Sequence, residues 1–274
     1  MSISASDFEF VSTLLRTDSA IALEAGKEYL VESRLGTLAR QEGHLSVDAL
    51  IAQVRLKADT GLRYKIVEAM TTNETSFFRD VAPFDALRDH VLPDLIAKRA
   101  AQRTLRIWCG ASSTGQEPYS LAMLIREHFP ALATWRVNIV ATDISREVLE
   151  RARTGKYTQL EVNRGLPAPM LVKYFEKDGI GWRVKPVVRE MVAFRELNLV
   201  APWTGVDSSD VVLMRNVLIY FDVLTKRTIL ANVRKIMRTD GYFMLGSAET
   251  TMNIDDNFKR VAVGKTSCYQ LAAQ

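Results

Sequence analysis

The sequence has few cysteines and histidines and no long apolar run. It holds two cysteines, Cys109 and Cys268, and three histidines in 274 residues, and neither set has the spacing of metal ligands. Neither a disulfide framework nor a metal site is therefore expected. No stretch approaches the ~20 apolar residues that a membrane helix needs, and the first ten residues do not resemble a secretion signal. These absences predict a cytoplasmic protein that does not insert into a membrane.

Charge is nearly balanced over the chain but not along it. The formal net charge of +4 is too small to require a nucleic-acid partner. Residues 1–80 carry 9 Lys and Arg against 12 Asp and Glu, whereas residues 81–274 carry 27 against 20. This shift, together with a change in hydrophobic pattern, predicts two domains that meet near residue 80.

The pattern of residues 1–80 predicts a small all-α domain. Ser6-Asp7-Phe8-Glu9 has the form of a capping box at the start of an amphipathic helix. A second helix is expected from about 26 to 42, with Gly43 as its stop, and Ser46 is a candidate cap for a third.

From residue 81 onward, apolar strands alternate with helical segments, which is typical of a parallel α/β sheet. A hairpin that turns at Gly264-Lys265 predicts an antiparallel pair at the C-terminal end. Residues 153–192 do not fit the alternation, and their Asp178-Gly179 turn predicts a small inserted β-subdomain. The expected strands are 105–109, 137–142, 192–195, 211–214 and 242–245, followed by the hairpin strands 258–263 and 267–271.

Two strand ends carry the first candidate ligand contacts. The first strand leads into a loop of small residues, Gly110 to Gly115, that lacks the G-x-G-x-x-G spacing of a dinucleotide site. The second strand ends in Asp143, whose carboxylate is suited to accept both hydroxyls of a ribose. The alternative role for Asp143 is the N-cap of the helix from 144 to 152. Together the two loops favour a nucleoside ligand without phosphates.

Two further polar segments flank these loops. Thr71 to Asp80 lies at the joint between the domains, and its Arg79 either pairs with a carboxylate or is an ordinary surface arginine. Met214 to Asp222 follows the fourth strand, which places Asn216 and Tyr220 at the same sheet edge as Asp143.

Five segments in this order resemble the CheR family of chemotaxis receptor glutamate methyltransferases: TTNETSFFRD, IWCGASSTGQEPYS, ATDISREVLERA, ELNL and MRNVLIYFD. The resemblance covers nearly the whole chain. It implies a Rossmann-like class I methyltransferase sheet with a small N-terminal all-α domain. It also implies S-adenosylmethionine as methyl donor, S-adenosylhomocysteine as product, and the cytoplasmic domains of methyl-accepting chemotaxis receptors as partners.

The resemblance also implies residue roles. Arg79 is expected nearest the carboxylate of the donor, and Arg34 and Arg40 match a helix that faces the receptor. The short turn around Gly179-Ile180-Gly181 argues against docking of a C-terminal receptor peptide, because members that bind one have a longer loop there. The expected cofactor contacts are Asn73, Thr75, Arg79, Glu117, Asp143, Asn198, Leu199, Arg215 and Asn216.

Methyl transfer from a sulfonium to a glutamate carboxylate requires no proton removal, because the side chain, with a pKa of about 4.3, is already ionised at neutral pH. The lack of an evident catalytic histidine fits this chemistry. Arg79 and Tyr220 are the candidate catalytic residues, with Tyr220 orienting the acceptor carboxylate by a hydrogen bond. The alternative for Tyr220 is packing beside Phe221.

Two other functions compete. An RNA methyltransferase would suit the basic larger domain, but Asn216 is not followed by the Pro-Pro-aromatic segment common in base-nitrogen methylation, and Cys109 lies in a strand where a nucleophile is poorly placed. A non-catalytic adaptor that senses S-adenosylmethionine and binds receptors without modifying them is the second alternative.

Overall fold

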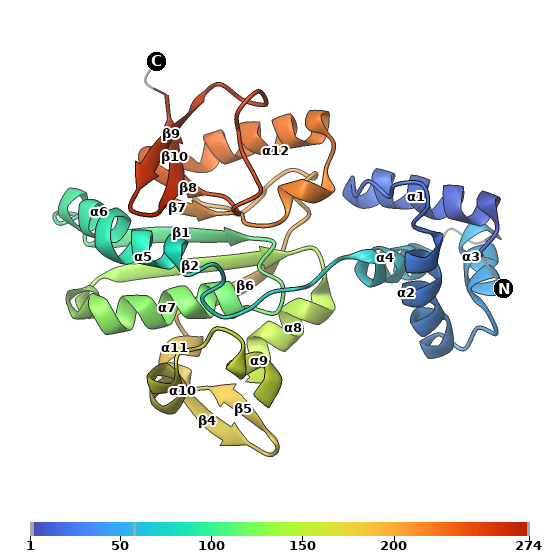
Figure 1. Ribbon diagram of the computed structural model, residues 1–274, viewed down its shortest axis with the longest axis horizontal. Coiled ribbons are helices and arrows are strands. Elements are labelled where there is room, and N and C mark those ends of the chain that lie inside the picture. The colour runs from blue at the N-terminus through green and yellow to red at the C-terminus, as the bar shows by residue number, and fades with distance from the viewer. Residues whose placement is uncertain (1–2, 57–58, 273–274) are drawn as a thin grey trace. The chain divides into compact units, whose positions relative to one another are not determined.

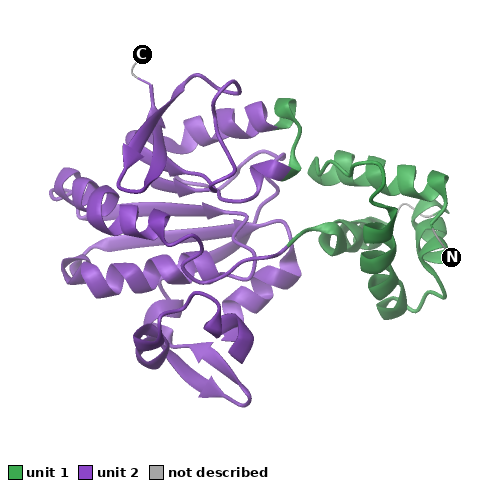
Figure 2. Ribbon diagram, viewed as in Figure 1, with its two compact units in different colours: residues 1–72, 220–225 green, residues 73–219, 226–274 purple. Residues whose placement is uncertain are grey.

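The computed structural model describes residues 3–56 and 59–272, which divide into two compact units (Figure 2). The first unit runs to Thr72 and takes in a second segment, Tyr220–Thr225. The second unit comprises Asn73–Ile219 and the chain from Lys226 onward. The division therefore falls at Thr72 rather than near residue 80, and Tyr220 belongs with the helices.

The first unit is all helical. Ser4, and not Ser6, caps its first helix, because the Ser4 hydroxyl accepts the Asp7 amide at 3.1 Å. The Ser46 hydroxyl accepts the Ala49 amide, as expected for the cap of the third helix. The helices are α1 (Ala5–Ser19), α2 (Glu28–Gln41), α3 (Val47–Leu56) and α4 (Thr60–Met70). Their core consists of fully buried aliphatic side chains: Val11, Leu15, Val31, Leu35, Leu50, Ile51 and Ile66.

The second unit is built on a seven-stranded sheet in the order β6-β2-β1-β7-β8-β10-β9 (Figure 1). The first five strands in this order are parallel, and β10 and β9 continue the sheet antiparallel. The predicted parallel sheet with its C-terminal hairpin is thus confirmed. The strands are β1 (Thr104–Gly110), β2 (Arg136–Asp143), β6 (Val192–Glu196), β7 (Ser209–Leu213), β8 (Met237–Met244), β9 (Phe258–Val263) and β10 (Thr266–Leu271).

Helices connect the parallel strands, and α7 packs against β2 and β6. The helix from Ala82 to Lys98 contains one π-helical turn between two α-helical segments. None of the helices in the described residues is long and apolar enough to cross a bilayer. These elements are α5 (Ala82–Ala86), η1 (Leu87–Val91), α6 (Leu92–Lys98), α7 (Gln116–His128), η2 (Pro130–Thr134), α8 (Arg146–Thr154), η3 (Leu218–Tyr220) and α12 (Val223–Ile236).

The predicted insertion forms a separate three-stranded sheet in the order β3-β5-β4 (Figure 1). Its tightest turn lies between Asp178 and Gly181, with Gly179 at a φ of +59°. An aromatic cluster ties it to the chain before α5, since the Phe77 ring contacts Tyr157 and Phe175 edge-on at 5.0 and 5.5 Å. The elements of this inserted unit are β3 (Lys156–Tyr157), α9 (Gln159–Asn163), α10 (Ala168–Tyr174), β4 (Phe175–Asp178), β5 (Gly181–Val184) and α11 (Pro186–Arg189).

Candidate functional site

The strand order reverses at β1, which lies between β2 and β7. The chain moves from β1 to β2 on one side and later returns to β7 on the other. Open α/β sheets bind ligands at such a switch point, outside the carboxyl ends of the strands. The loops that follow β1, β2, β6 and β7 are therefore the candidate site.

The loop after β1 is tightly wound. Ala111 and Ser113 both take left-handed backbone conformations, with φ of 55° and 49°. At Gly115, where φ is +91°, a Cβ would lie 3.1 Å from the Phe194 ring. Only glycine fits this position, because the conformation and the close contact both exclude a side chain. The small residues of this loop thus let it turn closely against β6.

Asp143 joins three of the loops. Its Oδ2 accepts the Ser113 amide at 2.8 Å, its Oδ1 accepts the Ser145 amide at 3.0 Å, and its carbonyl accepts the Leu197 amide at 2.9 Å. The cap of α8 is Ser145, whose hydroxyl accepts the Val148 amide. Asp143 is therefore not the N-cap, and its carboxylate is a buried acceptor at the switch point.

Arg215 forms a buried ionic cluster directly after β7. Its Nη1 donates to Glu117 at 2.9 Å, and its Nη2 donates to the Asp80 carboxylate at 2.8 Å and to the Arg79 carbonyl at 2.9 Å. Burial raises the pKa of Glu117, and the Arg215 charge opposes that shift. The Arg79 side chain is half-buried and donates to the Glu74 carbonyl at 3.0 Å.

Backbone contacts position the remaining predicted cofactor residues. The Asn73 carbonyl accepts the Ser113 hydroxyl at 2.9 Å, next to Asp143. After β6, the Leu199 carbonyl accepts the Trp203 indole at 3.0 Å. Thr75 is half-buried between Asn73 and Arg79. The second unit therefore holds all nine residues predicted to contact the cofactor: Asn73, Thr75, Arg79, Glu117, Asp143, Asn198, Leu199, Arg215 and Asn216.

The other three predicted residues, Arg34, Arg40 and Tyr220, belong to the first unit. The Arg34 guanidinium is engaged at the end of α4, where it donates to the Thr71 carbonyl at 3.0 Å and the Thr72 hydroxyl at 2.9 Å. Burial lowers the pKa of Arg34, and the nearby Tyr220 opposes that shift. Arg40 is exposed on α2. Arg34 thus acts within the fold, whereas Arg40 faces solvent.

Glu249 is a further residue of the site that the sequence motifs do not identify. Its carboxylate accepts the amides of Asn216, Val217 and Leu218, which lie 31 to 33 residues away in the chain. One signal does exist: the residues after Gly246 follow β8, the next parallel strand, and so reach the same sheet edge.

The buried polar atoms of the site suit a nucleoside ligand. Among the described residues, Ser112 Oγ and Asn216 Oδ1 are buried and have no hydrogen-bond partner. They lie in the loops after β1 and β7, on the two sides of the switch point. Unpaired buried polar groups are costly unless a ligand completes them. With the Asp143 carboxylate, they form a set suited to the hydroxyl and amino groups of an adenosine-type cofactor.

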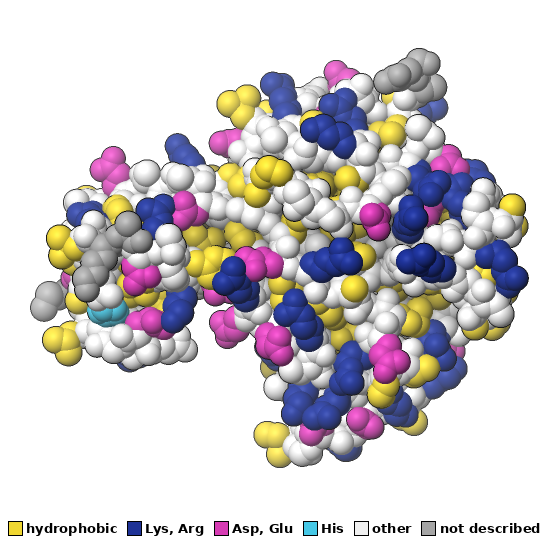
Figure 3. All heavy atoms as spheres, turned by 180° about the vertical axis from the view of Figure 1, so that it is seen from behind, with side chains coloured by type: hydrophobic (Ala, Val, Ile, Leu, Met, Phe, Trp, Pro, Cys, Tyr) yellow, Lys and Arg dark blue, Asp and Glu magenta, His cyan; other side chains and the backbone are white. Residues whose placement is uncertain are grey.

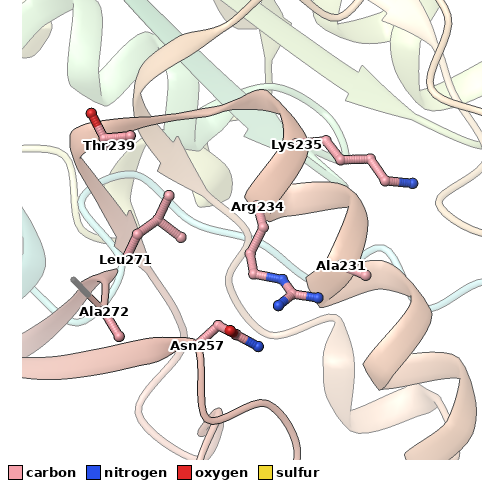
Figure 4. Close-up of a pocket in the computed structure, with 7 residues that line it drawn as sticks. All are labelled: Ala231, Arg234, Lys235, Thr239, Asn257, Leu271 and Ala272. Carbon is pink, nitrogen blue, oxygen red and sulfur yellow. The ribbon is translucent and has the colours of Figure 1, made fainter. Parts of the chain in front are cut away.

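An open groove of about 730 Å³ lies elsewhere in the second unit, between the end of α12 and the C-terminal hairpin (Figure 4). Arg234 extends from α12 toward Asn257, and Leu271 forms part of the opposite wall. No residue predicted for the site lines this groove. Within residues 3–56 and 59–272, no cluster of His, Cys, Asp and Glu is suited to hold a metal ion.

The sheet, its switch point and the carboxylate at the end of β2 are those of an α/β protein that binds a nucleoside-type ligand. The family model described as CheR methyltransferase, SAM binding domain, matches residues 73–266, and the model described as CheR methyltransferase, all-alpha domain, matches residues 6–71. The chain therefore belongs to the CheR methyltransferase family. The predicted family and cofactor are confirmed.

Curated relatives match this chain over nearly its whole length. Chemotaxis protein methyltransferase 1 of Pseudomonas aeruginosa is 43% identical over 95% of this chain and 96% of its own. Chemotaxis protein methyltransferase Cher2 of Pseudomonas putida is 39% identical over 96% of this chain and 97% of its own. The chain is thus an S-adenosylmethionine-dependent methyltransferase of chemotaxis. Among solved structures, the glycopeptide N-methyltransferase MtfA with S-adenosylhomocysteine has a TM-score of 0.35 at 15% identity, covering 64% of this chain and 57% of its own.

Proposed function

We propose that the protein methylates side-chain carboxylates of glutamate residues in the cytoplasmic domains of methyl-accepting chemotaxis receptors, producing glutamate methyl esters. The observation that carries this proposal is the composition of the sheet edge. Its charged side chains are carboxylates and arginines: Arg215 pairs with Glu117 and Asp80, and Asp143 accepts backbone amides. The names of the relatives, chemotaxis protein methyltransferases, support the choice of a chemotaxis protein as acceptor.

The histidines lie in other parts of the fold. His44 follows α2 in the first unit, His90 lies in η1 near Gly264, and His128 is the last residue of α7. A glutamate acceptor is already ionised at neutral pH, so the reaction gains little from a general base. Amine or hydroxyl acceptors, by contrast, must lose a proton. The placement of the histidines therefore favours a carboxylate acceptor.

In this proposal the donor is held by polar groups at the carboxyl edge of the sheet. Asp143 accepts the ribose hydroxyls, and Arg79 pairs with the carboxylate of the amino-acid end. When bound, S-adenosylmethionine supplies a methyl group on a cationic sulfur, and transfer to a carboxylate leaves both products neutral. Tyr220 orients the acceptor carboxylate, and the tight loops keep water away from the reacting atoms. The remaining proposed donor contacts are Asn73, Thr75, Glu117, Asn198, Leu199, Arg215 and Asn216.

Positive charge on two surfaces supports an acidic protein partner. Residues 153–192 contain 8 Lys and Arg against 4 Asp and Glu, and on the face shown in Figure 3 basic side chains crowd over the inserted unit at the bottom of the view. Arg40 adds an exposed cation on α2. The Arg34 guanidinium is less available to bind a receptor, because its N–H groups donate to Thr71 and Thr72 at the end of α4. The turn at Gly179 has two residues, so the proposal does not include docking of a receptor C-terminal peptide.

Methylation of an RNA base carbon has no suitable nucleophile here. Cys109 is fully buried in β1, and burial raises the pKa of its thiol well above the ordinary range. A thiol in this position is neither ionised at neutral pH nor accessible to a base.

The test is a transfer assay with S-adenosylmethionine carrying a labelled methyl group and a purified receptor cytoplasmic domain. The proposal predicts label in the receptor that mild base releases as methanol. A receptor domain with its candidate glutamates changed to alanine is the matched control and should stay unlabelled. Receptor binding without label would indicate an adaptor, and label transferred to RNA would contradict the proposal.

A further inference from the structure

The carboxylate of Glu249 sits in a ring of backbone amides. Four N–H groups point at its two oxygens, and all four distances lie between 2.6 and 2.8 Å. Among the described residues, the carboxylate forms no ion pair, so these amides are its ligands. The donors are the amides of Asn216, Val217, Leu218 and Gly246.

This ring fixes an unusual backbone. Asn216 has a φ of 59°, the left-handed region that non-glycine residues enter at a cost. A Cβ at Gly246 would lie 2.7 Å from Glu249 Oε2 and 2.9 Å from the Asn216 backbone nitrogen. Only glycine at position 246 therefore lets the Glu249 carboxylate and the Asn216 backbone lie this close to the chain after β8. Hydrogen bonds to the Glu249 carboxylate therefore hold the loop after β7 against the loop after β8, an arrangement that we call the clamp.

The clamp has a consequence for the Asn216 side chain. Its Oδ1 is buried and has no partner among the described residues. A loop optimised only for stability would satisfy that acceptor, since an unpaired buried polar group is costly. The arrangement instead presents the acceptor at the switch point.

We propose that Glu249 is a positioning residue for methyl transfer, which holds Asn216 in its left-handed conformation so that its side chain meets the donor. This inference rests on the proposed function, because Asn216 is a donor contact in that proposal. The same clamp sets the Leu218 amide at the start of η3, and η3 ends at Tyr220. Glu249 touches neither donor nor acceptor and acts through the loop.

The chemistry of the clamp explains why the residue is a glutamate. A carboxylate offers only acceptors, whereas glutamine would turn an NH₂ group toward backbone N–H groups. Glu249→Gln therefore keeps the size of the side chain and breaks part of the ring. Glu249→Asp keeps the charge and the acceptors but shortens the reach.

The experiment compares three variants in the full-length protein. Glu249→Gln and Glu249→Asp disturb the clamp, and Glu161→Gln is the matched control, because the Glu161 carboxylate also accepts a backbone amide, that of Thr158, at 2.9 Å in the inserted unit. Calorimetry measures affinity for S-adenosylhomocysteine, and hydrogen exchange without ligand measures protection of residues 215–219.

Glu249→Gln should weaken S-adenosylhomocysteine binding about tenfold and speed exchange in residues 215–219, since charge-assisted bonds to amides are lost. Glu249→Asp should fall between Glu249→Gln and wild type. Glu161→Gln should bind within about twofold of wild type, because its change is at the surface and far along the chain. In steady state, Glu249→Gln should raise KM for the donor more than it lowers kcat.

Two results would overturn the inference. One is wild-type affinity in both Glu249 variants despite faster exchange, which would make the clamp a stability device. The other is wild-type protein that does not bind S-adenosylhomocysteine, which would remove the donor site itself. If wild type binds this ligand but labels no receptor glutamate, the proposed acceptor is wrong while the role of Glu249 toward the donor is still decided by the calorimetry.

Discussion

Two buried arginines stand at opposite edges of the same sheet, and each is held by two carboxylates. Arg99 lies at the amino-terminal edge, where its three donor nitrogens all bond to Asp210 and Asp240 at 2.5 to 2.9 Å. Arg215 lies at the carboxyl-terminal edge, and its Nε is buried without a partner among the described residues. Arg99 uses all three donor nitrogens, whereas Arg215 leaves one unused. In the Arg99 cluster, the second arginine that pairs with Asp210, Arg238, likewise has a buried Nε without a hydrogen-bond partner among the described residues.

Left-handed residues lie near both clusters. Beside Arg215, φ is 66° at Asp80 and 59° at Asn216, and near Arg99, φ is 49° at Arg103, whose amide donates to the Arg99 carbonyl. Because both clusters are ionic and both have such residues nearby, neither a buried salt bridge nor a left-handed residue alone marks an active site. The carboxyl-terminal edge is distinguished by two buried loop acceptors, Ser112 Oγ and Asn216 Oδ1, that have no partner among the described residues.

The largest effects should come from removing either arginine. Arg215→Met should lose ~3 to 5 kcal/mol of unfolding free energy, because it leaves the buried Glu117 carboxylate without its partner. Arg99→Met should lose less, because the buried Asp210 carboxylate still pairs with Arg238. Urea denaturation measures both losses. Only Arg215→Met should also weaken S-adenosylhomocysteine binding. Equal loss of ligand affinity in Arg99→Met would remove the distinction between the edges.

Asp143→Ala and Arg79→Ala should weaken S-adenosylhomocysteine binding by ~1.5 to 3 kcal/mol each, because each removes charge-assisted hydrogen bonds to the ligand. Isothermal titration calorimetry measures the change. Asp240→Ala, at the opposite edge, is the control and should bind as wild type does. Unchanged affinity in both site variants would refute the assignment of the donor site.

The contributions of the two edges to the free energy of unfolding should change with pH in opposite directions. Burial holds the pKa of Glu117 above its ordinary 4.5, so the folded state keeps a proton that the unfolded state loses, and stability should fall as pH rises above 4.5 toward the folded-state pKa. Hydrogen bonds from Arg99 hold the pKa of Asp240 below its ordinary 3.8, so its contribution is present above 3.8 and is lost as pH falls through the lower folded-state value.

Unfolding free energies measured from about pH 2, below the ordinary value of 3.8 for Asp240, to about pH 8, above the ordinary value of 4.5 for Glu117, test both signs. Glu117→Gln should flatten the decline above pH 4.5, and Asp240→Asn should reduce the loss below pH 3.8. A Glu117→Gln profile parallel to that of wild type would show that burial of this carboxyl is not coupled to folding.

The smallest effect concerns the acceptor. Tyr220→Phe should slow turnover several-fold, since a single hydrogen bond contributes about 1 kcal/mol, and should leave S-adenosylhomocysteine affinity near wild type. Initial rates with a receptor domain, paired with calorimetry, separate the two quantities. A fully active Tyr220→Phe would assign the tyrosine to packing.

Much of the sheet could be predicted because its information is local. Strands such as 211–214 are continuous runs of β-branched and apolar residues, as expected when helices cover both faces. Asp143 could be placed at the carboxyl edge for the same reason, since a polar residue at the end of such a strand must reach that edge. The Gly264 and Gly179 turns fixed the two hairpins, and both have positive φ.

The errors arose where local patterns are ambiguous or where contacts span the sequence. Ser4 and Ser6 each stand three residues before a carboxylate, so the capping pattern fits both, and tertiary packing selects Ser4. Tyr220 joins the first unit through its carbonyl, which accepts the Ala22 amide at 3.1 Å. These two residues are far apart in the chain, so no local sequence pattern predicts their hydrogen bond. Glu249 was missed for the same reason.

The structure of the complex with S-adenosylhomocysteine tests the central claim most directly. The account predicts that the ligand lies outside the carboxyl ends of β1 and β7, with its ribose hydroxyls on Asp143 and with Ser112 Oγ or Asn216 Oδ1 gaining a partner. A ligand bound in the groove beside Arg234, or one that leaves Asp143 without contact, would contradict it.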